Sequence, residues 1–435
     1  MSATTTNSPP AKGEYPEGGR GFLPKLRFPE FLTAAAWSKK AIGPYLVDCS
    51  GRVASDTDLP IYSSTREGLK RQDAYFDGQV LQNKNDYGVV PAECFVYRHM
   101  SDDGLFKFNI NRTGGDIAVS KEYPVFKAKG INSKFLLVQL NDGLDFKRYA
   151  YSQKAGGTRT RLYFSRLCEW QTPLPSIAEQ QKIAACLSSL DELIAAQARK
   201  VEALKTHKKG LMQQIFPREG ENKPRFRFPE FQNDSDWEEK RVDELGDVLA
   251  GKALAATAPG PLRPYLRTKN VLDGEINLSD VLTMPMTDAE FSRFEVLNGD
   301  VLLNEGQTLE LVGRASIYRG EFEGRCAMQN QLIRFRAFPS TCREFAAQTF
   351  RKCQKDGTFA RIATQTTSVA HLGSSRFSAL TLLWPPSLHE QQHIASCLSG
   401  VDVLITTEIQ ELDTLKTHKK GLMQQLFPAM DEMRA

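Results

Sequence analysis

The sequence predicts an α+β protein in which two mixed α/β domains are separated by two long helices that pair as an antiparallel coiled coil. The segment Pro175–Pro217 returns as Pro386–Pro428, with 26 of 43 positions identical and no gap. Both copies carry a helical repeat of apolar residues. Each copy follows a segment of about 150–160 residues that mixes strand-like apolar runs with Gly, Asn and Pro turns.

Composition places the chain among globular proteins. Of 435 residues, 41% are hydrophobic and 25% charged, which is ordinary for a soluble, folded protein. No run of 18 apolar residues occurs, so we expect no membrane span. The first 21 residues are polar and rich in Pro and Gly, which predicts a disordered leader and no secretory signal.

Cysteine spacing and charge exclude some classes of site. The eight cysteines form no CxxC or other close metal-ligand spacing, so we expect reduced thiols in the cytoplasm and no metal. The formal charge is +4, yet residues 22–174 hold 22 basic and 16 acidic residues, whereas residues 223–385 hold 21 of each. Near-neutral domains neither exclude nucleic-acid binding nor argue for it.

The repeated segment is predicted to be a long helix. Ser176 and Ser387, each followed three residues later by a glutamate, predict a capping box with reciprocal side-chain contacts. Pro217 and Pro428 end the helices. Residues 179–216 would form a rod of roughly 57 Å. The apolar seam has polar residues at two positions in each copy; its members are Ile183, Leu187, Leu190, Ile194, Gln197, Val201, Leu204, Lys208, Leu211 and Ile215, with Ile394, Leu398, Val401, Ile405, Glu408, Leu412, Leu415, Lys419, Leu422 and Leu426.

The block Leu-Lys-Thr-His-Lys-Lys-Gly-Leu-Met-Gln-Gln near the end of each copy is identical in both. It is either a surface that meets the same partner twice or the solvated end of a duplicated coiled coil. Its histidines, His207 and His418, lie among lysines and are poor candidates for metal ligands. A shorter repeat joins Arg27–Phe31 to Arg227–Phe231, with Trp37 and Trp237 following at equal spacing.

The two mixed segments show no similarity to each other between these repeats. Strand-like runs in the second are residues 301–303, 332–336 and 379–384, and in the first residues 135–140 and 93–97. No catalytic motif stands out in either segment. The phosphate loop GxxxxGK[ST], an Asn/Asp-Pro-Pro-aromatic motif, GxSxG and HExxH are all absent. We therefore expect no catalytic residue in this chain.

The order of the motifs resembles the specificity subunits of type I restriction-modification systems. Each long helix opens with Glu-Gln-Gln, at Glu179–Gln181 and Glu390–Gln392. Further motifs lie in the same order, at residues 62–69, 299–306, 311–315 and 329–333. The resemblance implies seven segments: leader 1–21, target-recognition domain 22–174, spacer helix 175–217, linker 218–222, target-recognition domain 223–385, spacer helix 386–428 and tail 429–435.

The resemblance also implies a function. Each domain would read one half of a bipartite site on double-stranded DNA, and because the domains differ, the two half-sites would differ. The helices would set the spacing and dock two methyltransferase subunits, which motor-nuclease restriction subunits would join. The chain itself would hold no cofactor; S-adenosylmethionine would come with the methyltransferase subunits, and ATP with Mg with the motor subunits.

Candidate residues follow from polar loops and from the repeated blocks. For DNA contact we predict cations and amides that can bind phosphates or base edges: Arg66, Lys70, Arg71, Lys154, Arg159, Arg161, Arg267, Lys269, Gln307, Thr308, Arg314, Arg361, Gln365 and Thr366. For partner contact we predict the repeated polar residues of the helices: Glu179, Gln180, Gln181, His207, Lys208, Lys209, Glu390, Gln391, Gln392, His418, Lys419 and Lys420. The alternative is a non-catalytic coiled-coil adaptor that tethers two unrelated domains without DNA specificity.

Overall fold

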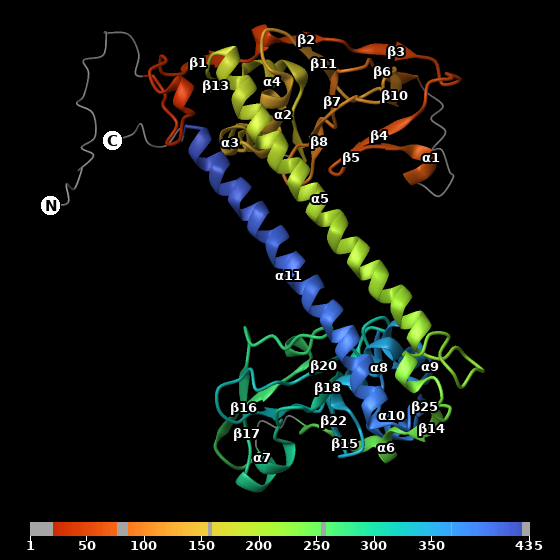
Figure 1. Ribbon diagram of the computed structural model, residues 1–435. Helices are drawn as coiled ribbons and strands as arrows, with labels where there is room; N and C mark the ends of the chain where they lie inside the picture. Colours follow the sequence, from red (N-terminus) through yellow and green to blue (C-terminus); the bar gives the residue numbers. More distant parts are fainter. Residues whose placement is uncertain (1–20, 76–85, 155–158, 254–257, 367, 429–435) are drawn as a thin grey trace, which may run out of the picture. The chain divides into compact units, whose positions relative to one another are not determined.

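A computed structural model describes residues 21–75, 86–154, 159–253, 258–366 and 368–428 (Figure 1). The predicted leader, apart from Gly21, lies outside these ranges, as do the tail 429–435 and parts of two predicted polar loops, 156–158 and 367. The chain divides into two compact units, residues 1–197 with 411–435, and residues 198–410. The predicted bounds of the seven segments stay a prediction.

Short, mainly antiparallel strands build the first unit (Figure 1). Its largest sheets have the orders β2-β11-β7-β9 and β10-β6-β3. Its elements are η1 (Pro29–Phe31), β1 (Ser38–Ala41), η2 (Gly43–Tyr45), β2 (Leu46–Asp48), β3 (Gly51–Val53), β4 (Tyr62–Thr65), β5 (Gly68–Arg71), α1 (Gln72–Tyr75), β6 (Tyr87–Val90), β7 (Phe95–Tyr97), β8 (Met100–Ser101), β9 (Phe108–Ile110), β10 (Ile117–Ser120), β11 (Val125–Ala128), α2 (Ser133–Asp142), α3 (Leu144–Ser152), β12 (Thr160–Arg161), α4 (Phe164–Glu169) and β13 (Gln171–Leu174).

Aromatic side chains fill the core of the first unit. Phe95 stacks on Phe126 with 4.8 Å between ring centroids, and Phe146 meets Trp170 edge-on at 4.9 Å. Phe427, just after the second long helix, packs on Phe135 of α2 at 5.6 Å. The core of this unit is therefore completed by the far end of the chain.

The prediction of a strand-like run at residues 135–140 is wrong, because these residues form the middle of helix α2. Asn132 caps this helix by accepting a hydrogen bond from the Phe135 amide at 2.9 Å. The buried residues of α2 recur at helical spacing, with Phe135 and Leu136 one turn before Gln139 and Leu140. A short apolar run does not distinguish a strand from a buried helix by itself.

The second unit has its own core around the four-stranded sheet β15-β22-β18-β20. The runs 301–303 and 332–336 predicted as strands here are confirmed as β18 and β22, whereas the run 379–384 is confirmed only for β25, because Ala379 ends helix α10. Its elements are η3 (Pro229–Phe231), β14 (Glu238–Arg241), α6 (Val242–Leu245), β15 (Gly246–Ala250), β16 (Leu262–Leu266), η4 (Thr268–Asn270), β17 (Leu282–Pro285), α7 (Asp288–Phe294), β18 (Val301–Asn304), β19 (Gly306–Gln307), β20 (Ala315–Ile317), β21 (Ala327–Met328), β22 (Leu332–Ala337), α8 (Arg343–Lys355), α9 (Thr358–Ile362), β23 (Thr364–Thr366), β24 (Val369–His371), α10 (Ser374–Ala379) and β25 (Thr381–Trp384).

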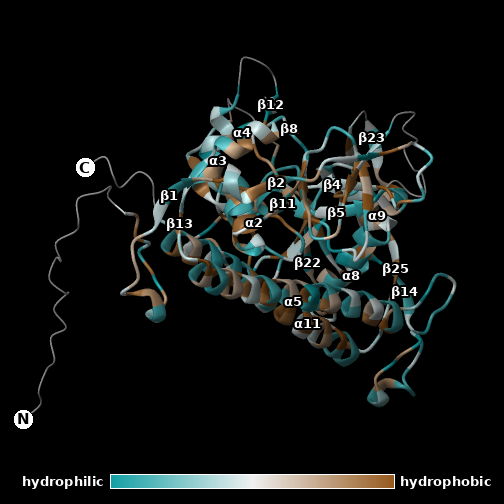
Figure 2. Ribbon diagram, turned by 90° about the horizontal axis from the view of Figure 1, so that it is seen from above, coloured by the Kyte–Doolittle hydropathy of each residue, from teal (hydrophilic) through white to brown (hydrophobic). Residues whose placement is uncertain are grey.

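The two long helices are α5 (Ile177–Ile215) and α11 (Leu388–Leu426), as the repeat predicts. Their hydrophilic and hydrophobic residues alternate along the ribbon in Figure 2. In the first unit Lys419 pairs with Asp191, and Gln197 donates to Glu411. In the second unit the pairs are Lys208 with Asp402 and Lys200 with Glu408. In both units a later residue of one helix meets an earlier residue of the other, so the antiparallel pairing is confirmed.

A buried ion pair fastens the start of each long helix to the short repeat of its own unit. Arg27 donates through Nε and a terminal nitrogen to both oxygens of Glu179, at 2.7 and 2.8 Å. Arg227 does the same with Glu390, at 2.8 and 2.7 Å. Both glutamate side chains are only 1% exposed. The two sequence repeats are therefore partners in one contact, formed once in each unit.

The capping-box prediction is half right. The amides of Glu179 and Glu390 donate to Ser176 and Ser387 at 3.3 Å, as expected for an N-cap. The glutamate carboxylates do not reach back to the cap, because both of their oxygens bind the arginines.

The glutamine after each glutamate adds a second fastening. Gln180 accepts from the Asn132 amide at 2.9 Å and donates to the Pro175 carbonyl at 3.0 Å. In the second unit Gln391 accepts from the Cys342 amide and donates to the Pro385 carbonyl. The entry of each long helix is thus tied to the first turn of a domain helix, α2 or α8.

The two mixed domains share one set of backbone contacts, called the frame here, that a comparison of their sequences does not reveal. Strand β1 pairs with β13 directly before α5, and β14 pairs with β25 directly before α11. The Leu26 amide donates to Gln425 at 2.9 Å, and the Phe226 amide donates to Gln214 at the same distance. The expectation that the domains are unlike each other is therefore wrong for the frame and holds for what the frame carries.

We expect Arg227→Met to lower the free energy of unfolding by about 3–5 kcal/mol, because it leaves the Glu390 carboxylate buried without a counter-charge. Urea unfolding followed by tryptophan fluorescence measures this loss. Arg225→Met is the matched control, since Arg225 is exposed two residues away. Equal losses in both variants would contradict a stabilising role of the pair.

Candidate nucleic-acid interface

Polar residues predicted on two separate loops of the second unit meet in one small sheet. Strand β24 pairs with β19 on one side and with β23 on the other. Gln307 and Gln365 both lie opposite Ala370, so their side chains share one face of the sheet. Thr366 lies opposite Val369 on the same ladder, and the exposed Thr308 follows β19 directly.

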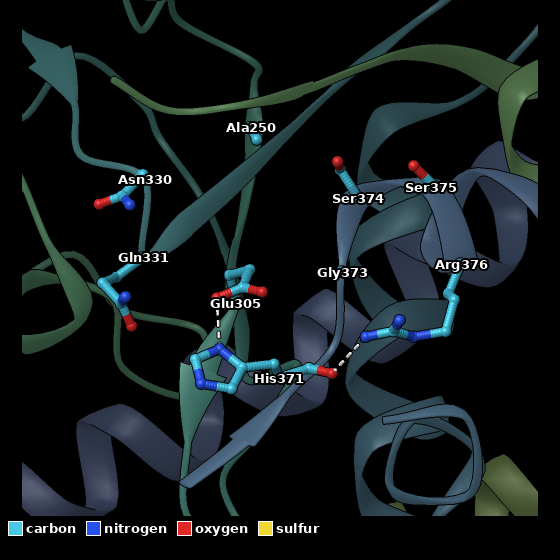
Figure 3. A pocket seen from close by; sticks show the side chains of 9 residues that line it. All are labelled: Ala250, Glu305, Asn330, Gln331, His371, Gly373, Ser374, Ser375 and Arg376. Carbon is cyan, nitrogen blue, oxygen red and sulfur yellow. Dashed lines mark hydrogen bonds and ion pairs between the residues drawn. The ribbon is translucent and has the colours of Figure 1, made fainter. Parts of the chain in front are cut away.

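An open pocket of about 480 Å³ lies beside this sheet (Figure 3). Carboxylate, imidazole, guanidinium, amide and hydroxyl groups line it, which is typical of a site that recognises a polar ligand. Its lining residues are Ala250, Glu305, Asn330, Gln331, His371, Gly373, Ser374, Ser375 and Arg376.

Glu305 and His371 face each other inside the pocket, as Figure 3 shows. One carboxylate oxygen of Glu305, Oε2, lies 3.1 Å from Nδ1 of His371. Arg376 donates to the His371 carbonyl at 2.8 Å, to the Leu372 carbonyl at 3.1 Å and to the Thr364 hydroxyl at 3.0 Å. The positive charge of Arg376 is thereby held at one side of the pocket by neutral groups.

Two glycines lie against side chains that line the pocket. A Cβ on Gly306 would lie 2.2 Å from Oε1 of Gln331 and 3.3 Å from the His371 ring. Gly373 has φ +71°, a backbone conformation that residues other than glycine rarely adopt, and a Cβ there would lie 2.7 Å from the Arg376 guanidinium.

The hydrogen-bond register identifies the equivalent positions in the first unit. The Leu372 amide donates to Glu305 at 2.8 Å, and the Leu162 amide donates to His99 at 2.8 Å. By the pairing of β8 with β12, Met100 stands where the second unit has Gly306, and Arg161 stands where it has His371. Tyr163 precedes α4 as Gly373 precedes α10, and its ring lies over His99 with centroids 5.7 Å apart.

Two of the predicted cations of the first unit meet at one turn. Arg66, at the tip of the β4–β5 hairpin, binds Asp103 at 2.6 Å, and Arg159 binds Asp102 at 2.8 Å. Arg66, with Ser101 and the Leu105 amide, lowers the pKa of Asp103 to about 2. The structure thus brings Arg66 and Arg159 together, each already paired with a carboxylate.

The other predicted residues of the first unit lie on exposed or half-exposed surface. Lys70 pairs with Glu67, and Arg71 pairs with Asp73 at 2.9 Å. Lys154 and Arg161 are exposed. Their contact with DNA stays a prediction.

In the second unit the predicted cations have internal partners as well. Arg267 and Lys269 both pair with Asp280. Arg314 donates to the Val271 carbonyl at 3.2 Å, and Arg361 binds the Asp356 carbonyl and the Thr358 hydroxyl beside helix α9. These contacts give Arg314 and Arg361 a structural role, and their contact with DNA also stays a prediction.

Four of the predicted partner contacts are buried inside the chain, namely Glu179, Gln180, Glu390 and Gln391, with at most 3% exposure. The fastenings described above account for their repetition without any partner. Their neighbours Gln181 and Gln392 are exposed, as are His207, Lys209, His418 and Lys420. The exposed six stay predicted partner contacts.

Lys208 and Lys419 serve the helix pair itself. Lys208 is buried and lies 2.7 Å from both oxygens of Asp402, with Gln348 of α8 at 3.1 Å. Burial opposes the ionisation of Asp402, but Arg351, Gln348 and Lys208 more than offset it, so its pKa lies below the usual value. The repeated lysine therefore joins both long helices to a domain helix of the second unit.

A family model described as the type I restriction modification DNA specificity domain matches residues 70–206 and 234–417. The chain belongs to this family. The match covers most of both mixed domains and most of both long helices. No helix of the described ranges is long and apolar enough to cross a membrane.

Two relatives come from Methanocaldococcus jannaschii. Over 194 residues the chain is 23% identical to the putative type I restriction enzyme MjaX specificity subunit. This match covers 44% of this chain and 45% of that protein. Over 81 residues it is 35% identical to the type I restriction enzyme MjaVIII specificity subunit, with 18% and 19% covered. The chain thus matches less than half the length of either relative.

Solved structures show the same fold. The S subunit of a type I restriction-modification system from M. genitalium has a TM-score of 0.57 and 14% identity, with 94% of this chain and 99% of that chain covered. A chain from a structure on complex assembly and conformational transition of the type I R-M system has a TM-score of 0.53 and 15% identity, with 90% and 98% covered.

None of the pocket residues was predicted as a site residue, although Glu305, Asn330 and Gln331 lie in the motifs at 299–306 and 329–333; His371 and Arg376 lie in no such motif. A faint signal exists, since Leu162, Ser165 and Arg166 recur at the spacing of Leu372, Ser375 and Arg376. That pattern would have aligned the two domains at the pocket, but three residues in two dissimilar segments carry little weight alone.

We expect Lys208→Met to lower the free energy of unfolding by roughly 1.5–3 kcal/mol, because it removes the charge-assisted hydrogen bonds of Lys208 to Asp402 while Arg351 still pairs with that carboxylate. Chemical unfolding of the full chain measures the change. Lys209→Met is the control, since Lys209 is exposed on the same helix turn. A loss no larger than that of the control would contradict the role assigned to the Lys208–Asp402 pair.

Proposed function

We propose that this chain is the DNA sequence-specificity subunit of a type I restriction-modification complex, with each mixed domain reading one half of a bipartite site. One observation carries the proposal. The same frame is built twice, and at register-equivalent positions it carries different polar side chains, His99 and Arg161 in one unit and Glu305 and His371 in the other. A constant frame with exchanged side chains suits a protein that recognises two different sequences.

Specific reading of DNA requires two kinds of contact. Cations and backbone amides position the protein on phosphates, while side chains with fixed hydrogen-bonding groups distinguish base edges. The Arg66–Arg159 surface suits the first role, and the amide-rich sheet β19-β24-β23 with its pocket suits the second. The predicted target-recognition domains, residues 22–174 and 223–385, contain these surfaces.

The remaining assignments extend the proposal to the complex. The exposed Gln181, His207, Lys209 and their repeats would dock two methyltransferase subunits, which motor-nuclease subunits would join. S-adenosylmethionine, ATP and Mg would belong to those subunits, and this chain would be non-catalytic and cytoplasmic. A coiled-coil adaptor without DNA specificity is the weaker alternative, because it gives no reason for family membership that extends through both mixed domains.

The first prediction concerns domain exchange. When the chain is co-expressed with its modification subunit, long-read sequencing of the host genome should show adenine methylation at a bipartite motif. Replacing residues 22–174 by the corresponding domain of another specificity subunit should change one half of that motif and leave the other half intact. A stable complex that modifies no motif would favour the adaptor.

A second prediction concerns the ion pair at the hairpin tip. We expect Asp103→Asn to strengthen sequence-independent DNA binding and to steepen the plot of log affinity against log salt by about 1, because Arg66 becomes available to a phosphate. Binding of a random duplex at several salt concentrations measures both effects.

Asp116→Asn is the matched control for this experiment. It removes one negative charge from the same unit, and the exposed Asp116 is not the carboxylate that Arg66 binds. If both variants raise affinity equally with unchanged slope, the effect is one of net charge, and Arg66 is not the group that binds phosphate.

A further inference from the structure

The pocket beside β19 and β24 contains hydrogen-bonding capacity that the chain itself does not use. Glu305 binds His371 through Oε2, and among the described residues its Oε1 has no hydrogen-bond partner. The side chains of Asn330 and Gln331, which Figure 3 shows at the same pocket, likewise have no partner in the described part of the chain. These groups offer two amides and a carboxylate oxygen to a ligand.

A carboxylate on a DNA-reading surface needs a specific reason, because phosphates repel it. In the major groove, the groups of DNA that a carboxylate binds well are exocyclic amines, at N4 of cytosine or N6 of adenine. Glu305 is only 16% exposed, and His371 fixes its direction. It is therefore placed to accept one hydrogen bond in one orientation.

We propose that this pocket is a base-reading subsite of the second domain, in which Glu305 accepts a hydrogen bond from the exocyclic amine of an adenine or a cytosine. The inference rests on the proposed function and names the chemical group that this domain reads. Asn330 and Gln331 supply donors and acceptors for the neighbouring positions of the same base. Arg376, fixed by the His371 and Leu372 carbonyls and Thr364, supplies a positive charge at the pocket wall.

The pocket is a property of the second domain. Met100 and Tyr163 stand at the positions of Gly306 and Gly373 in the first unit, and His99 stands at the position of Glu305. His99 is 8% exposed, and its Nδ1 has no partner among the described residues. A histidine beneath a tyrosine ring cannot present an anionic acceptor, so the two domains differ in the group that they offer to a base.

The test uses the full-length chain and base analogues that lack one amine. The half-site of the second domain is first defined by selection from a randomised DNA duplex library. Each adenine of that half-site is then replaced by purine, and each cytosine by 2-pyrimidinone, one position at a time. Wild type should lose about tenfold in affinity at one position, and Glu305→Ala should bind the normal and the amine-free duplex equally well at that position.

Two further variants separate recognition from folding. Glu305→Gln keeps an acceptor oxygen and should retain part of the discrimination, whereas Glu323→Ala, which changes an exposed acid of the same unit, should retain all of it. Every variant that is correctly folded should keep the preference for the half-site of the first domain, so this preference serves as the folding control.

The outcomes distinguish the two proposals. Absence of any sequence preference in wild type would overturn the proposed function. A clear bipartite preference, with equal losses from amine removal in wild type and Glu305→Ala at every position, would overturn the pocket assignment and leave the function standing. If Glu305→Ala loses both half-site preferences, Glu305→Gln decides the outcome. The pocket assignment is overturned if amine removal lowers the affinity of Glu305→Gln no more at the sensitive position than at other positions of the duplex.

Discussion

The buried arginine–glutamate pairs are the contact on which the rest of the structure depends. Each pair joins a short loop at the start of a mixed domain to the first turn of the helix that follows the same domain. Charged groups so deeply buried are tolerated only when they are fully paired, and here both carboxylate oxygens are bound. The pair therefore fixes where the domain begins and ends, and the polar surfaces inherit their positions from it.

Sequence reasoning predicted the features that periodicity and repetition encode. The long helices, their serine N-caps, their pairing and three strands of the second unit followed from apolar spacing and from identical segments. It did not find that Arg27 and Glu179 belong to one contact, because the two repeats recur at different spacings and look independent. Helix α2 was missed because a buried helix of ten residues and a buried strand share one apolar composition.

The candidate site was predicted in part and for a physical reason. Composition predicted Gln307 and Gln365 on polar loops, whereas the structure places them in strands β19 and β23 of one sheet. Glu305 and His371 lie in strands or beside them, and nothing in their local sequence separates a pocket-lining acid from a solvated one. Most of the predicted cations proved to be paired with carboxylates, so a count of basic residues overstates the positive charge that these loops present.

The division of the chain into units has a consequence for biosynthesis. The second unit is continuous, residues 198–410, whereas the first needs both residues 1–197 and the segment from 411 onward. During translation residues 21–197 leave the ribosome before the second unit, whereas Lys419 and Phe427, which belong to the first unit, follow only after it. The order of emergence and the order of completion are therefore opposite, so the N-terminal domain must wait with an unfilled edge of its core while its neighbour folds.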